Sequence, residues 1–178
     1  NIKKRGISMS ESNQKTLKIL AQKLDAASSK ILMTCSLVIL ASVLMHDGDH
    51  LRQAWNWGYN IPLSLLVLNL VVYILPAVSI FLTKMERASA SLVVAFAGVF
   101  TTAGFLIIHL CGAFSGLWGV WNFSYFELIK GVTWQGVYYQ GVDWISWVFL
   151  FEVPVLCLPS SFVAFRQYLR LKKAALGA

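Results

Sequence analysis

An apolar run, ILMTCSLVILASVLM (residues 31–45), leads straight into HDGDH (residues 46–50). A membrane-spanning helix needs roughly 20 mostly apolar residues, and the run reaches that length when residues 26–30 and His46 are added to its ends. The HDGDH motif therefore follows the end of a predicted transmembrane helix. Two imidazoles and two carboxylates within five residues form a dense set of metal-ligand types.

The composition of the whole chain indicates an integral membrane protein. Hydrophobic residues make up 57% of the 178 residues and charged residues only 13%, whereas a soluble domain is typically about 25% charged. Besides the span at about 30–46, segments at about 61–83, 88–113 and 144–165 are long and apolar enough to cross a bilayer. Backbone amides in lipid must be paired within their own segment, so the predicted fold is an all-α, four-transmembrane-helix bundle.

The basic residues predict the orientation of this bundle. All of them except Arg52 and Lys130 lie before the first span, between the second and third, or after the fourth. By the positive-inside rule both termini are predicted to be cytoplasmic, in a prokaryotic cytoplasmic membrane, with the basic residues facing anionic lipid of the cytoplasmic leaflet. The predicted organisation is a basic lead-in at 1–29, a membrane domain at 30–166 and a basic tail at 167–178.

Two further features of the basic residues bear on partners and on the N-terminus. The net charge of +7 does not indicate a nucleic-acid-binding protein, because the basic residues flank membrane spans and no stacking motif accompanies them. Within residues 10–29, apolar side chains recur at helical spacing and predict a short amphipathic helix on the cytoplasmic surface. A frayed extension of the first span is the alternative.

The three histidines are predicted to lie on the extracytoplasmic side. His109 ends the third span, which runs in the same direction as the first. If the first helix continues through Gly48, then His46, Asp49 and His50 share a face, because positions three and four apart are neighbours on a helix. If Gly48 breaks the helix, the same residues can chelate a metal from a loop. The predicted ligands of a Zn, Cu or Fe ion are His46, Asp49, His50 and His109, with Asp47 as a further ligand or as a hydrogen-bond acceptor for one of them.

Two other interpretations of the histidines remain open. In the first, Asp47 or Asp49 caps a short surface helix that stops near Gly58, and the histidines are ordinary interfacial polar residues. In the second, His46 and His109 are the axial ligands of a b-type haem held between parallel helices. Small residues in the third span would make room for such a haem, namely Ala97, Gly98, Thr101, Thr102 and Gly104.

Glu152 stands about eight residues into the fourth span, a costly depth for a carboxylate. It is a candidate proton relay, a metal ligand, the partner of a polar group in another protein, or a protonated residue hydrogen-bonded inside the bundle. By depth, its expected internal partners are Asn69 in the second span and Thr101 or Thr102 in the third.

The connection at about 114–143 is rich in aromatic residues and glycine. We predict an interfacial helix at 117–130, followed by linked turns, because glycine recurs every five residues from Gly131 and that period fits neither a helix nor a strand. The connection is an aromatic membrane anchor, a lid over the histidines, or the contact surface for other membrane subunits. The predicted contact residues are Trp118, Trp121, Trp134, Tyr138 and Tyr139.

No standard catalytic signature is present, so no reaction and no catalytic residue is predicted. The leading predicted function is a membrane-embedded metal-binding protein with a His/Asp site at the extracytoplasmic face, serving as a redox or oxygenase-type subunit or in metal handling. The alternative is a non-catalytic accessory subunit of a larger membrane complex. A small b-type haem protein is the second alternative.

Overall fold

The computed structural model describes residue 19 and residues 22–110, 133–134, 137–138 and 141–177. These residues form the helices α2 (Ala26–Trp57), α3 (Leu63–Asn69), α4 (Val71–Lys84), α5 (Ala90–Leu110) and α8 (Trp144–Gly177), and the two-residue strands β1 (Thr133–Trp134) and β2 (Val137–Tyr138). Counting Leu63–Lys84 as one segment, four helical segments are long and apolar enough to cross a membrane. The predicted helical protein with four candidate spans is confirmed.

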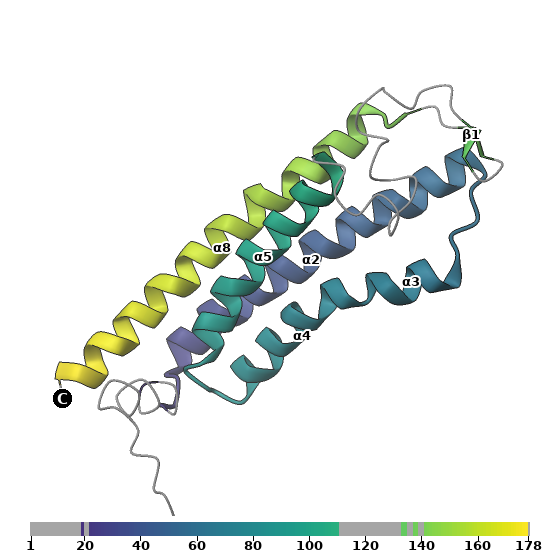
Figure 1. Cartoon of the computed structure of the whole chain (residues 1–178). Coiled ribbons are helices and arrows are strands. Elements are labelled where there is room, and N and C mark those ends of the chain that lie inside the picture. Colours follow the sequence, from purple (N-terminus) through teal and green to yellow (C-terminus); the bar gives the residue numbers. More distant parts are fainter. Residues whose placement is uncertain (1–18, 20–21, 111–132, 135–136, 139–140, 178) are drawn as a thin grey trace, which may run out of the picture.

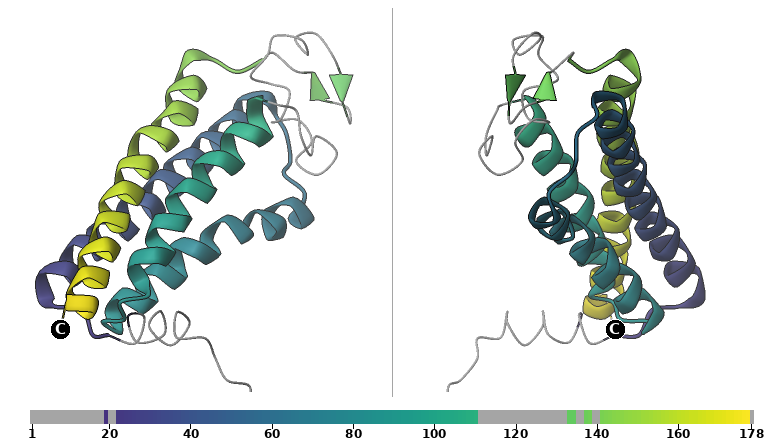
Figure 2. Two further views of the ribbon diagram at one scale, coloured as in Figure 1. Left: turned by 60° about the vertical axis from the view of Figure 1, so that its left-hand side comes forward. Right: turned by 90° about the vertical axis from the view of Figure 1, so that its right-hand side faces the viewer.

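The helices form an elongated bundle in which α2, α5 and α8 lie side by side (Figures 1 and 2). The helices α2 and α5 run in the same direction, and α8 runs back against both. One end of the bundle contains the start of α2, the α4–α5 connection and the end of α8 (Figure 1). We call it the basic end, because the described basic residues other than Arg52 lie there. The opposite end is called the histidine end.

The core lies where α2, α5 and α8 meet. Its largest fully buried apolar side chains come from all three helices: Leu32, Ile39 and Val43 from α2, Val94 from α5, and Leu150 and Val153 from α8. Many large apolar residues on the outward faces are exposed, including most of α3. That pattern is expected of a bundle surrounded by lipid, where apolar surface need not be hidden from water.

The first helix is longer than predicted and resolves the question about Gly48. Asp25 caps its start, since the Asp25 carboxylate accepts a hydrogen bond from the backbone N–H of Ser28 at 2.8 Å, and the helix continues through Gly48. It ends at Gly58, which adopts the left-handed conformation (φ 64°) that favours glycine. The alternative of a separate surface helix that begins at Asp47 or Asp49 is therefore wrong, although the stop that it placed near Gly58 is where α2 ends.

The lead-in before α2 is only partly described. Leu24 is buried in the core, and the segment from Gln22 to Asp25 is not helical but pairs with the α4–α5 connection. The backbone N–H of Leu24 donates to the carbonyl of Glu86 at 2.8 Å, and that of Ala88 donates to the carbonyl of Gln22 at 3.0 Å. The rest of the predicted amphipathic helix before residue 22, apart from Ile19, lies outside the described residues.

In the aromatic connection, β1 and β2 pair in antiparallel register, with Thr133 opposite Tyr138 and Trp134 opposite Val137. The prediction of turns without regular structure is therefore wrong for these four residues. Strand pairing needs only local hydrogen bonds, so a five-residue period does not prevent a minimal hairpin. The predicted interfacial helix at 117–130 lies outside the described residues.

Close packing of α5 against α8 gives a first prediction. A Cβ atom added at Gly98 would lie 2.2 Å from Ser161 Oγ and 2.5 Å from the backbone oxygen of Cys157. Gly98→Ala should therefore push the two helices apart and lower the free energy of unfolding by about 1–3 kcal/mol. Gly104→Ala is the matched control on the same helix, because nothing lies within 4 Å of its added Cβ. Thermal unfolding in detergent compares the two, and equal melting temperatures would contradict this packing.

Candidate metal centre

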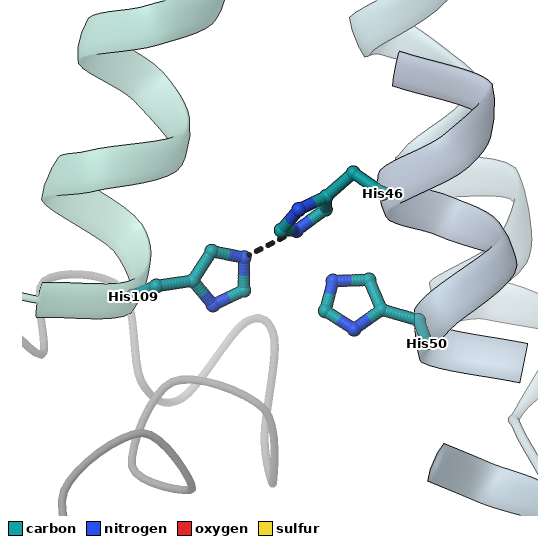
Figure 3. A group of neighbouring side chains, drawn as sticks. All are labelled: His46, His50 and His109. Atoms are coloured by element: carbon teal, nitrogen blue, oxygen red, sulfur yellow. Dashed lines mark hydrogen bonds between the residues drawn. The ribbon is translucent and has the colours of Figure 1, made fainter. Parts of the chain in front are cut away.

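The three histidines of the chain converge at the histidine end of the bundle. His46 and His50 lie one turn apart on α2, and His109 approaches them from the last turn of α5 (Figure 3). The side chains of His46 and His109 are buried, at 0% and 3% exposure, and His50 is partly buried. One ring nitrogen from each of the three lies within 4.8 Å of the others. Two segments far apart in the sequence thus supply a group with the composition of a metal site.

The spacing of the rings is close to what one ion would require. His46 Nε2 and His109 Nε2 are 3.1 Å apart (Figure 3). Two imidazole nitrogens on a tetrahedral Zn²⁺ ion, each about 2.0–2.1 Å from the metal, lie about 3.3 Å from one another. The ring centroid of His50 is 4.6 Å from that of His46 and 5.2 Å from that of His109. Small side-chain rotations would therefore place three nitrogens around one ion.

The rings are also oriented by other groups. His46 Nδ1 lies 3.3 Å from the carbonyl oxygen of Phe149 on α8, an oxygen that can only accept, so Nδ1 carries the proton. His50 Nδ1 makes a longer contact of 3.5 Å with Gln53 Oε1. Metal-binding histidines commonly donate their second N–H to a carbonyl or carboxylate, which turns the other nitrogen toward the metal. The structure leaves Nε2 of His46 as the nitrogen that faces the other histidines.

Asp49, predicted as a ligand, is directed elsewhere. Its carboxylate is fully buried and accepts hydrogen bonds from Arg52 Nε at 2.7 Å and from Gln53 Nε2 at 2.7 Å. Arg52 also makes a bidentate ion pair with the carboxylate of Asp143, at 2.7 and 2.8 Å. Ser146 Oγ accepts hydrogen bonds from both Arg52 and Gln53. We call these five residues the Arg52 cluster. It ties the end of α2 to the start of α8, and Asp49 is not part of the histidine group.

Asp47 faces a different neighbour. Its Oδ2 atom accepts hydrogen bonds from Asn69 Nδ2 at 2.6 Å and from the hydroxyl of Tyr73, on α3 and α4. Asp47 is not among the residues whose ligand atoms gather with the histidines. The structure therefore brings His46, His50 and His109 together and assigns the two predicted aspartates to other contacts.

The geometry does not favour haem between His46 and His109. Axial ligands lie on opposite faces of the porphyrin with iron between them. Here the two Nε2 atoms are in direct hydrogen-bond contact at 3.1 Å, and the ring of Phe105 packs 4.4 Å from that of His46. No room for a macrocycle remains between the two rings.

Glu152 has a partner that depth alone did not predict. Its Oε2 atom accepts a hydrogen bond from Ser42 Oγ on α2 at 3.3 Å, whereas Asn69 is hydrogen-bonded to Asp47. The expected pairing with Asn69 is therefore wrong, and neither Thr101 nor Thr102 makes a hydrogen bond to Glu152 among the contacts of the described residues. Glu152 Oε1 is buried and has no partner in that part of the chain.

Sequence reasoning missed the helix that supports the site. Four polar residues recur at three- and four-residue spacing along one face of α2: Ser42, His46, Asp49 and Gln53. Three of them make hydrogen bonds to α8, namely Ser42, His46 and Gln53. Asp49 is hydrogen-bonded to Gln53, which contacts α8. We call this line of contacts, from Ser42–Glu152 through His46–Phe149 to the Arg52 cluster, the polar seam. The spacing was visible in the sequence as a polar stripe on an otherwise apolar helix.

The predicted contact residues Trp118, Trp121 and Tyr139 lie outside the described residues, and for Trp134 and Tyr138 only the strand pairing is described. The accessory-subunit function stays a prediction. Comparison with known proteins adds no further guide, because no family model, curated protein or solved structure matches the chain.

The Arg52 cluster predicts a pH dependence. The hydrogen bonds from Arg52 hold the pKa of Asp143 below its ordinary value. A carboxyl with a lowered folded-state pKa contributes stability that is present above the unfolded-state pKa of about 3.9 and is lost as pH falls through the folded value. Asp143→Asn, which keeps a cap for the start of α8, should therefore melt below the wild type at neutral pH. The difference should shrink below about pH 4, and a difference that is constant down to pH 3 would contradict the assignment.

Proposed function

We propose that the chain is a membrane-embedded metal-binding protein that holds one transition-metal ion between His46, His50 and His109. The observation that carries this proposal is the convergence of three imidazoles from two helices, with ligand atoms within 4.8 Å of one another. Three histidines that converge inside a bundle favour a functional site, because polar side chains at membrane depth are costly and are commonly functional.

The electrostatics of the group support the proposal. Burial disfavours a charged imidazolium ring, and the neutral ring is the form that binds metals. The nearest described acids are already engaged, Asp49 by Arg52 and Gln53, and Asp47 by Asn69 and Tyr73. A neutral imidazole offers a lone pair to a metal ion, so a transition-metal ion suits this group.

The number of ligands points to the kind of metal chemistry. Imidazole nitrogens suit Zn, Cu and Fe ions. Structural zinc sites use four protein ligands, whereas sites with three keep a position for water or substrate, and three ligands gather among the residues that the structure describes. We therefore favour a site with an exchangeable position, as redox, oxygenase-type and metal-handling functions each require, over a purely structural one.

The proposal is tested by metal content. Purified wild-type protein incubated with Zn²⁺ and then desalted should retain about one ion per chain, and His50→Ala should lose it while remaining inserted and helical. Asp49→Asn is the matched control one position away on the same helix, because Asp49 bonds Arg52 and Gln53 rather than the histidine group. Elemental analysis measures the bound metal, and circular dichroism measures the helical content.

Retention of the ion by His50→Ala would refute the three-histidine site. Loss of the ion in Asp49→Asn, with the fold intact, would instead restore the sequence-based ligand set that includes this carboxylate. Repeating the experiment with Cu and Fe salts identifies the preferred metal.

We also propose that the basic end faces the cytoplasm, as the positive-inside rule predicts. In a variant whose native cysteines are replaced by alanine, Asn56→Cys at the histidine end should react with a membrane-impermeant maleimide added outside intact cells. Met85→Cys at the basic end should react only after the cells are opened. Both positions are exposed, and the reverse labelling pattern would overturn the orientation.

A further inference from the structure

A cavity of about 270 Å³ lies beside the histidine group, between α2 and α3. Its wall is largely apolar and is formed by Leu51, Ile61, Leu65, Leu66 and Leu70. Figure 1 shows α3 standing apart from α2 at this level, whereas α4 approaches the bundle nearer the basic end. Of the three histidines, His50 lines this cavity, and His46 and His109 do not. It is therefore adjacent to the proposed metal.

Asp47, Asn69 and Tyr73 form the polar part of this cavity. Both donors point at one carboxylate oxygen: Asn69 Nδ2 at 2.6 Å and the Tyr73 hydroxyl both donate to Asp47 Oδ2. The other oxygen, Oδ1, is buried and has no hydrogen-bond partner among the described residues. Leaving a buried acceptor of this kind unpaired costs about 1–3 kcal/mol, so the site is suited to a ligand that donates a hydrogen bond.

The charge around Asp47 selects the kind of donor. Its two donors from the chain are both neutral groups, an amide and a phenol. A cationic ammonium group would have to leave water to enter an apolar pocket, and it would be repelled by a metal ion on the other side of His50. A hydroxyl group donates one hydrogen bond without adding a charge.

We propose that this cavity binds a small, neutral, lipid-soluble molecule that carries a hydroxyl group, an alcohol or a phenol, with the hydroxyl donating to Asp47 Oδ1. The apolar body of the ligand lies against the leucines of α2 and α3. Drug-sized ligands occupy pockets of about 300–1,000 Å³, so a cavity of this size takes one ring with a short tail rather than a long lipid. The proposal deepens the proposed function, and rests on it, in placing such a molecule beside a metal ion.

The test uses para-butylphenol as the probe and butylbenzene, which lacks only the hydroxyl, as its matched partner. Titration calorimetry is done on the full chain in phospholipid nanodiscs with bound Zn²⁺, and empty nanodiscs correct for partition into lipid. The wild type should bind para-butylphenol saturably and about tenfold more tightly than butylbenzene, because a hydrogen bond to a charged group contributes about that much.

Two variants separate the hydrogen bond from the cavity. Asp47→Asn should abolish the preference for the phenol and should instead favour a phenyl ketone of similar size, because the amide offers a donor where Oδ1 offered an acceptor. Leu66→Trp should fill the cavity and abolish binding of every probe. Val67→Trp is its matched control, since Val67 is exposed on the same helix and does not line the cavity.

The outcomes distinguish this inference from the metal proposal. Equal affinity of the wild type for para-butylphenol and butylbenzene, with metal bound, would overturn the hydroxyl site and leave the metal site standing. Selective phenol binding that Asp47→Asn removes, in a wild type that retains no metal, would refute the proposed function but support the cavity. Retention of phenol binding by Leu66→Trp would place the probe outside this cavity and overturn the inference.

Discussion

The polar seam between α2 and α8 is the contact on which the candidate site depends. Inside a bilayer, a polar side chain that fails to find a partner within the protein has no water to replace it, so a row of such residues specifies which helix faces which. Ser42, His46 and the Arg52 cluster can all be satisfied together only when α8 lies antiparallel to α2 in one register. The apolar core adds packing energy but does little to specify which helix faces which, because similar aliphatic residues line every helix. The seam therefore sets both the rotation of α2 and the side on which His46 meets His109.

Close approach of α5 completes the arrangement. Gly98 allows the backbone of α5 to contact α8 near Cys157 and Ser161, and α5 then carries His109 to the level of His46 at the far end. One helix thus supplies two histidines, a second supplies the third, and the third helix of the core supplies the carbonyl that orients His46. Each of these roles belongs to a different element. The site is consequently a property of the assembled bundle rather than of the HDGDH motif alone.

The sequence allowed the helices and the shared level of the histidines to be predicted, because both follow from the lengths of apolar runs and the alternating direction of spans. The ligand set was harder, since Asp47 and Asp49 differ from His46 by one and three positions and their directions depend on which helix lies on each side. Asp47 turns toward α3 and α4 and Asp49 toward α8. Depth within the membrane did not identify the partner of Glu152 either, because residues at the same depth surround it on several helices. The packing of α2 against α8 makes Ser42 the hydrogen-bond partner of Glu152.

The contact between His46 and His109 has a consequence for the proposed metal site. Since His46 Nδ1 donates to the Phe149 carbonyl, neutral His46 has only a lone pair on Nε2, and His109 must present its Nε2 proton to it. This internal hydrogen bond lies at the place where the proposed ion would coordinate. If the proposed ion binds His109 through Nε2, that residue would have to change tautomer or give up its Nε2 proton, so entry and departure of the ion would depend on proton movement as well as on diffusion.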